Sequence, residues 1–83
     1  MEVTSPIELA HLTAMFDEAI QNALILRVRT RENAILVGSA HWRDGGTLVL
    51  RRLDDRRRVR IDCHEVSHLD VVGVGVKDYE FEI

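Results

Sequence analysis

Five residues near the end of the chain, His64 to His68, read H-E-V-S-H and match the pattern H-E-x-x-H. On a helix, two histidines four positions apart point the same way and can bind one zinc ion. The glutamate between them can then activate a metal-bound water for hydrolysis. Besides the pattern, this chemistry needs a helix of several turns, a third ligand for the metal and a cleft for the substrate.

The residues around the pattern favour a structural interpretation over a zinc site. The flanking segments RRVRID and VVGVGV are rich in β-branched residues, and Gly73 and Gly75 interrupt the second one, which is typical of strands. Val74 stands where the extended pattern has a third histidine. The other candidate third ligands have no established spacing, and they are His41, Asp70, Glu80 and Glu82. We therefore predict no metal, no cofactor and no enzymatic activity.

The arginines are the second group of residues that could do chemistry. All ten lie between Arg27 and Arg60 together with four carboxylates, whereas the rest of the chain has one lysine and ten carboxylates. Arginine can form two parallel hydrogen bonds to a phosphate or a carboxylate, so this basic middle favours an anionic ligand or a head-to-tail partner. Ion pairs within the chain and a compositional bias toward arginine are the alternative explanations. The candidate ligand-binding residues are Arg27, Arg29, Trp42, Arg43, Arg58 and Arg60.

Trp42 is the only tryptophan, and it stands between His41 and Arg43 at the end of a predicted strand. An exposed tryptophan beside arginine can stack on a nucleic acid base, although a lone tryptophan is more often part of a core or an interface. The net charge of −3 argues against loose binding of DNA, which draws on a net positive charge. Local binding of RNA or of a nucleotide is compatible with this charge.

Length and composition set further limits. The chain has 83 residues, of which 46% are hydrophobic and 30% charged, and it fits one globular domain over residues 1–83. The single cysteine, Cys63, suits a reducing compartment, and no segment resembles a signal peptide or a membrane span. We therefore expect a cytoplasmic protein, bacterial or phage in style, that begins at Met1 and does not associate with membranes.

The N-terminal segment predicts an amphipathic helix over about residues 6–22. Ser5 can cap this helix, Pro6 suits its first position, and Glu8 stands where a capping box requires it. The apolar residues form one stripe with helical spacing, and they are Leu9, Leu12, Phe16, Ala19, Ile20 and Ala23. Because the opposite face is polar, this stripe must pack against another element.

The residues after the helix predict five or six short antiparallel strands. The segments are LILRVRT, AILVGSAHW, TLVLRRL, RRVRIDC, VVGVGV and YEFEI. Gly38 lies inside the second strand and predicts a bulge or a bend, and EVSHL is predicted as one tight turn that Val66 and Leu69 seat on the core. The fold class is therefore mainly β (α+β), with the helix capping one end of a small antiparallel barrel over about residues 24–83.

This order of elements resembles the Sm-like or SH3-like small barrel. The stretch from about residue 16 to 72 also resembles the WYL domain, an Sm-like ligand-sensing module of bacterial regulators. The step from Ala19-Ile20 into LILRVRT and the segment RRVRIDCHEVSHLDV carry this likeness, whereas Thr47-Leu48-Val49-Leu50 stand where the family has its W-Y-L tripeptide. The Sm RNA-binding signatures are absent, so the Sm resemblance implies a fold and not a function.

Three functional hypotheses follow. The first is a non-catalytic binding or regulatory module that engages RNA, a nucleotide or a partner protein through its arginine-rich face. The second is a self-assembling ring or adaptor, because edge strands can pair head-to-tail; Tyr79, Phe81 and Ile83 of YEFEI would form the interface. The third is a zinc-dependent hydrolase that uses His64, Glu65 and His68, or a metal without a catalytic role that His64, His68 or Cys63 would bind. We expect a homo-oligomer in the first two cases.

Overall fold

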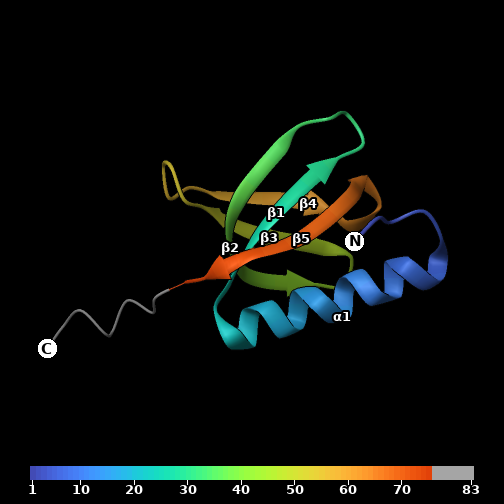
Figure 1. The fold of residues 1–83 in the computed structure, drawn as a ribbon, viewed down its shortest axis with the longest axis horizontal. Helices are drawn as coiled ribbons and strands as arrows, with labels where there is room; N and C mark the ends of the chain where they lie inside the picture. Colours follow the sequence, from blue (N-terminus) through green and yellow to red (C-terminus); the bar gives the residue numbers. More distant parts are fainter. Residues whose placement is uncertain (76–83) are drawn as a thin grey trace, which may run out of the picture.

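The computed structural model describes residues 1–75 and shows an α+β fold with an N-terminal helix and a five-stranded antiparallel sheet (Figure 1). The elements are α1 (Pro6–Asn22), β1 (Leu24–Thr30), β2 (Ile35–Asp44), β3 (Thr47–Arg52), β4 (Arg58–Asp62), the 3-10 helix η1 (Cys63–Glu65) and β5 (Val66–Val74). The predicted helix and the first four predicted strands are confirmed to within two residues, whereas the predicted strand YEFEI lies outside the described residues. Among residues 1–75, no helix is both long and apolar enough to cross a bilayer.

Helix α1 begins and ends at residues suited to its two ends. The Ser5 hydroxyl accepts a hydrogen bond from the Glu8 amide at 3.3 Å, and the Glu8 carboxylate accepts one from the Thr4 hydroxyl at 2.6 Å. Ala23 ends the helix in the left-handed conformation, with φ of 53°, and its amide donates to the Ala19 carbonyl. The stripe residues Leu12, Phe16 and Ala19 are fully buried. The apolar stripe of the sequence is therefore the face that packs on the sheet.

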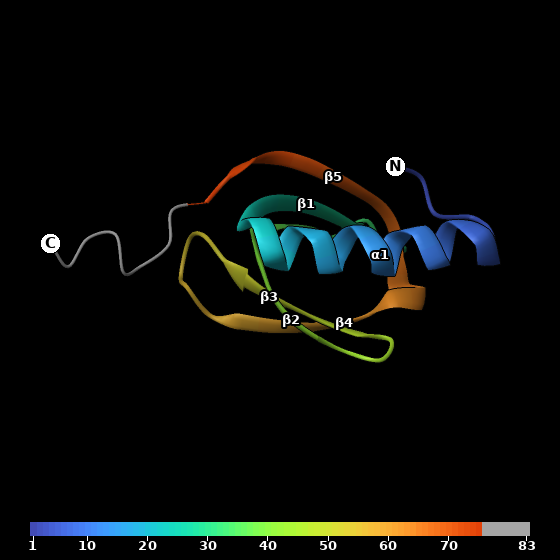
Figure 2. The same cartoon turned by 90° about the horizontal axis from the view of Figure 1, so that it is seen from below.

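The sheet has the strand order β4-β3-β2-β1-β5, and all neighbours are antiparallel. Strands β1 to β4 form a meander, and β5 returns to pair with β1. Strands β4 and β5 are the two edges and do not pair with each other within residues 1–75, so the sheet is open and the prediction of a closed barrel is wrong. Helix α1 lies between the β1–β5 side and the β3–β4 side of the bent sheet (Figure 2). It packs mainly on β2 and β1, where it buries Leu12, Phe16 and Ala19.

A bend in β2 allows the sheet to curl around this core. At Gly38 a Cβ atom would lie against the carbonyl oxygen of Arg51 and 2.7 Å from its carbonyl carbon, so the two backbones approach more closely than any other residue allows. Two residues further on, the pairing with β3 shifts between Ala40 and Trp42 and leaves His41 as an extra residue, which is a β-bulge. The glycine inside this strand therefore marks a bend, as its position in the sequence predicts.

The predicted turn EVSHL is only partly correct. The turn is the 3-10 helix Cys63–Glu65, and the residues from Val66 onward already belong to β5. Val66 pairs with Thr30 and His68 pairs with Arg29, so Ser67 is an extra residue in a second β-bulge. Val66 and Leu69 are both fully buried, as predicted. Their spacing of three residues suggested a turn, but the bulge produces the same spacing within a strand.

The first three residues lie along the outer edge of β5. The Val3 amide donates to the Ser67 carbonyl and the Leu69 amide donates to the Met1 carbonyl, at 2.8 and 2.9 Å. The amino group of Met1 also donates to Asp70 at 2.8 Å, and Val3 is buried in the core. Residues 1–3 therefore pair with the first half of the outer edge of β5. They do not reach the second half of this edge, which ends at Val74.

Candidate functional site

An exposed aromatic ring and two arginines line one surface hollow on the outer face of β2, β3 and β4. The hollow has a volume of about 490 Å³ and is lined by His41, Trp42, Val49, Arg58 and Arg60. The strand register explains why these residues meet, because Trp42 on β2 pairs with Val49 on β3, which in turn pairs with Arg60 on β4. We call this surface the Trp42 hollow.

The bulge at His41 determines how Trp42 is presented. Ala40, just before the bulge, faces the core, while Trp42, just after it, is 51% exposed. The extra residue places both His41 and Trp42 along the hollow, whereas strict alternation would place them on opposite faces. Val49 has only 5% exposure and forms an apolar floor between the ring and the arginines. The result is a flat aromatic and apolar surface with cations at its rim.

The charges around the hollow are positive. Among the residues that the structure describes, no carboxylate forms an ion pair with Arg58 or Arg60. Burial first, and then the charges of Arg58 and Arg51, lowers the pKa of the His41 imidazole. His41 is therefore neutral at pH 7, where it can donate or accept a hydrogen bond, and the positive charge of the hollow comes from the arginines.

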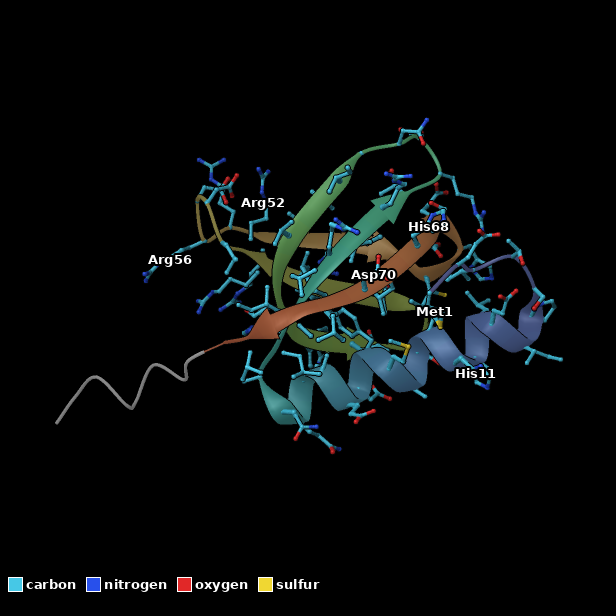
Figure 3. All side chains as sticks on the ribbon, in the orientation of Figure 1. Met1, His11, Arg52, Arg56, His68 and Asp70 are labelled. Carbon is cyan, nitrogen blue, oxygen red and sulfur yellow. The ribbon has the colours of Figure 1, made fainter. Side chains whose placement is uncertain are left out.

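Arg27 and Arg29 lie on a different part of the same outer face. They project from β1 into a smaller hollow of about 110 Å³, which Ile35, His68 and Asp70 complete. The Asp70 carboxylate binds the Met1 amino group at 2.8 Å and Arg27 at 3.4 Å (Asp70 and Met1 are labelled in Figure 3). These contacts, the Met1 contact first, lower the pKa of the Asp70 carboxyl. Arg27 is thus partly neutralised, while Arg29 forms no ion pair within residues 1–75. We call this surface the β1 hollow.

Arg43 lies outside both hollows and has a contact of its own. Its Nε and one terminal nitrogen donate to the two carboxylate oxygens of Asp17 on α1, at 2.7 and 2.6 Å, and its other terminal nitrogen donates to the Gly45 carbonyl. The hydrogen bonds from Arg43 lower the pKa of the Asp17 carboxyl. This geometry fastens the helix to the β2–β3 hairpin. The structure thus separates Arg43 from Trp42, its neighbour in the sequence.

The H-E-x-x-H residues do not share a helix. His64 lies in η1 and His68 lies in β5, so the pattern spans a turn and a strand. His64 Nδ1 is 3.0 Å from an Asp62 carboxylate oxygen, and His68 Nε2 is 3.6 Å from a Glu2 carboxylate oxygen. The two imidazoles therefore have separate acidic neighbours, and the helical arrangement on which the zinc chemistry depends is not formed.

His64 instead lies in a small cluster with the two residues before it. Potential ligand atoms of Asp62, Cys63 and His64 lie within 4.8 Å of one another. The Asp62 carboxylate also accepts a hydrogen bond from the His64 amide at 2.9 Å, which caps η1. Cys63 is 3% exposed, and burial first, then the charge of Asp62, raises the pKa of its thiol. The cluster is thus a turn cap next to a buried protonated thiol.

Several residues of the hollows could not be found from the sequence. Val49 and Ile35 look like ordinary strand residues, and only the register places one beside Trp42 and the other beside Arg29. His41 could be recognised by its position next to Trp42, but alternation assigns it to the opposite face. The predicted interface residues Tyr79, Phe81 and Ile83 lie outside the described residues, so that prediction stays untested.

Comparisons of this chain with models of protein families, with curated proteins and with solved structures found no match.

Proposed function

We propose that this protein is a non-catalytic, cytoplasmic binding module that holds a nucleotide unit, free or within RNA, in the Trp42 hollow. The observation that supports this proposal most is the half-exposed Trp42 ring next to two arginines that lack a carboxylate partner within residues 1–75. A nucleotide has a flat base and an anionic phosphate. Stacking on an aromatic side chain contributes about 1–3 kcal/mol per base, and arginine binds phosphate with two parallel hydrogen bonds.

The sole tryptophan provides a direct measurement of this binding. Titration of a dinucleotide at low ionic strength should quench the fluorescence of Trp42, because the base would cover the ring. Replacing both rim arginines, Arg58→Ala with Arg60→Ala, should weaken binding by about tenfold or more, since a hydrogen bond to a charged group is worth about 1.5–3 kcal/mol.

A matched control removes the same charge elsewhere. Arg27→Ala with Arg29→Ala also removes two positive charges from the outer face, but these residues do not line the Trp42 hollow. This variant should bind the dinucleotide within about twofold of the original protein, with the small difference due to the long-range field. Equal losses in both variants, or no quenching at any concentration, would show that the Trp42 hollow is not a nucleotide site.

A second proposal is self-assembly through the two edge strands. The observation that favours it is the second half of β5, where Val71, Val72 and Val74 are 48%, 51% and 70% exposed next to an edge that lacks a strand partner within residues 1–75. Open edges of this kind pair with other chains. Native mass spectrometry measures this directly: assembly predicts an oligomer of fixed size that Val72→Lys or deletion of residues 79–83 breaks. A monomer at all concentrations would refute it.

The Sm-like resemblance supports both proposals without deciding between them. The order β4-β3-β2-β1-β5, the helix before β1 and the 3-10 helix before β5 agree with a bent small-barrel fold whose sheet is open. We propose that the fold is an opened variant of this type. The arrangement of His64 in a turn and His68 in a strand does not favour the zinc-dependent hydrolase. Glu65→Gln, which would matter only to a hydrolase, should therefore leave nucleotide binding unchanged.

A further inference from the structure

Four hollows follow one another across the outer face of the sheet. The Trp42 hollow and the β1 hollow are the two ends. Between them lie a hollow of about 220 Å³ lined by Ile25, Ser39, Arg51 and Arg56, among others, and a hollow of about 190 Å³ lined by Ile35, Val37 and Leu53, among others. Each hollow in this series either shares a lining residue with the next one or is lined by a residue that is paired across strands with a residue lining the next one. The outer face therefore carries a continuous track and not two isolated depressions.

The strand register joins the first two hollows. Ser39, Arg51 and Arg58 form one row across β2, β3 and β4, and Arg58 also lines the Trp42 hollow. The next two junctions are shared residues: Leu53 lines both central hollows, and Ile35 lines both the last central hollow and the β1 hollow. A ligand that leaves the Trp42 ring can therefore reach Arg29 while touching lining side chains throughout.

The track is rich in positive charge and in exposed apolar side chains. Arg52 is paired with Asp54 and Asp55, and Arg27 with Asp70. The arginines that line the track are Arg27, Arg29, Arg51, Arg52, Arg56, Arg58 and Arg60. Exposed apolar side chains alternate with these arginines, since Ile35 is 54% and Leu53 is 53% exposed. Single strands bind on surfaces that combine cations for the phosphates with aromatic side chains for the bases. Here Trp42 supplies the aromatic surface, and Ile35 and Leu53 supply apolar contact further along the track.

From this track we infer that the ligand is a single nucleic acid strand several nucleotides long, which runs from the Trp42 hollow along β2 to Arg27 and Arg29. This inference rests on the proposed function and specifies its ligand. The path runs mostly along β2: Trp42 and Ile35, which line its two ends, are seven residues apart on this strand, or about 23 Å at roughly 3.3 Å per residue. A strand of about four or more nucleotides fills this path, which is the lower end of the usual range of single-strand site sizes.

The charge of the track gives a second quantitative expectation. For a single strand, the logarithm of the binding constant falls with the logarithm of the salt concentration by about 0.7 per phosphate neutralised. A dinucleotide that carries a 5′-phosphate has two phosphates, so at the Trp42 hollow it should show a slope of about −1.4. A longer strand that neutralises four phosphates should show a slope of about −2.8. If the protein binds only one or two nucleotides, the salt dependence of binding should be the same for a dinucleotide and for a longer strand.

The experiment compares a dinucleotide with a hexanucleotide of the same base, measured by Trp42 fluorescence and by the anisotropy of a labelled strand. The hexanucleotide should bind about tenfold or more tightly. Arg27→Ala with Arg29→Ala should remove most of this gain while leaving dinucleotide binding within about twofold, because only the longer strand reaches the β1 hollow. Thermal unfolding of each variant checks that the fold is unchanged.

A neighbouring pair of arginines supplies the closest control. Arg56 lines the central hollow, whereas Arg57, the next residue of the same exposed turn, lines none of the four hollows. Arg56→Ala should weaken binding of the hexanucleotide by about three- to tenfold, and Arg57→Ala, with the same change in charge, by less than about twofold.

The possible results distinguish failure of the strand inference from failure of the proposed nucleotide site in the Trp42 hollow. Dinucleotide binding at Trp42 without any gain for the hexanucleotide, or a gain that Arg27→Ala with Arg29→Ala leaves intact, would overturn the track and keep the nucleotide site. Equal losses of hexanucleotide affinity in Arg56→Ala and Arg57→Ala would show that the strand responds to the overall positive charge and does not follow the track. That result would also overturn the inference. Failure of both strands to bind would overturn the proposed function and the track together.

Discussion

The close approach of β2 and β3 at Gly38 makes a sharp prediction about stability. In Gly38→Ala the new methyl group would overlap the carbonyl group of Arg51, whose carbon would be 2.7 Å away. Because the obstacle is backbone, β3 must move away from β2, and the pairs Gly38–Arg52 and Ser39–Arg51 must loosen. Overpacking costs about 1–3 kcal/mol, and two weakened backbone hydrogen bonds cost about 1 kcal/mol each.

The gain from replacing a strand glycine offsets only part of this cost. Alanine is favoured over glycine by about 0.5–1 kcal/mol within a strand, so the net loss for Gly38→Ala is about 2–4.5 kcal/mol. This is a large fraction of the stability of a small domain. With an m-value of about 1 kcal/mol per molar urea, the midpoint of unfolding should fall by about 2 M or more.

Gly73→Ala on β5 is the matched control, because the nearest atom to its new methyl group is a side-chain carbon of Ile25 at 3.8 Å, an ordinary contact. Urea unfolding followed by circular dichroism should therefore show a midpoint equal to or slightly above that of the original protein. If Gly38→Ala unfolds at the same urea concentration as Gly73→Ala, the bend of β2 does not depend on the missing side chain. The explanation given for the bend would then be wrong.

Three other predictions concern the helix and the turn. Ala23→Gly should raise the free energy of unfolding by about 0.5–1 kcal/mol, because Ala23 has a φ of 53°, whereas Ala14→Gly at an exposed position of the same helix should lower it by about 1 kcal/mol; urea unfolding measures both. Hydrogen bonds from Arg43 lower the pKa of the Asp17 carboxyl in the folded protein. The ion pair therefore stabilises the fold above the unfolded pKa near 3.8, and this stabilisation is lost as the pH falls through the lower pKa of the folded state. Asp17→Asn should make the free energy of unfolding depend less on pH in this acid range. Cys63 should react with a thiol reagent at pH 8 far more slowly in the folded protein than in urea, because burial raises the pKa of its thiol; equal rates would mean that the thiol is accessible.

Local patterns in the sequence predict the elements well where the backbone is regular. Ser5 and Pro6 indicate the start of α1, and the alternation in LILRVRT gives the correct buried face of β1. The errors fall at the bulges, where one extra residue reverses the alternation. At Ser67 such a residue makes a strand look like a turn, and at His41 it places two consecutive side chains along one hollow.

The candidate site was harder to predict because its residues meet only across strands. The arginine-rich middle of the chain pointed to an anionic ligand, and the structure places Arg58 and Arg60 beside Trp42. It places Arg43 elsewhere, however, because Asp17 is 26 residues away in the sequence and no local pattern links the two. Closure of the barrel could not be judged either, since the pairing of edge strands depends on the curvature of the whole sheet.

The position of β1 between β2 and β5 has a consequence for synthesis on the ribosome. Strands β2, β3 and β4 can pair in turn as they emerge, but the other edge of β1 has to wait for β5, and the paired residues Arg27 and Asp70 are 43 positions apart. At about 5–20 residues per second, this delay lasts about 2–9 seconds. During that time the nascent chain exposes a β-strand edge beside Leu26 and Val28, which are buried in the finished fold. Arrival of β5 is therefore the step at which productive folding competes with aggregation between nascent chains.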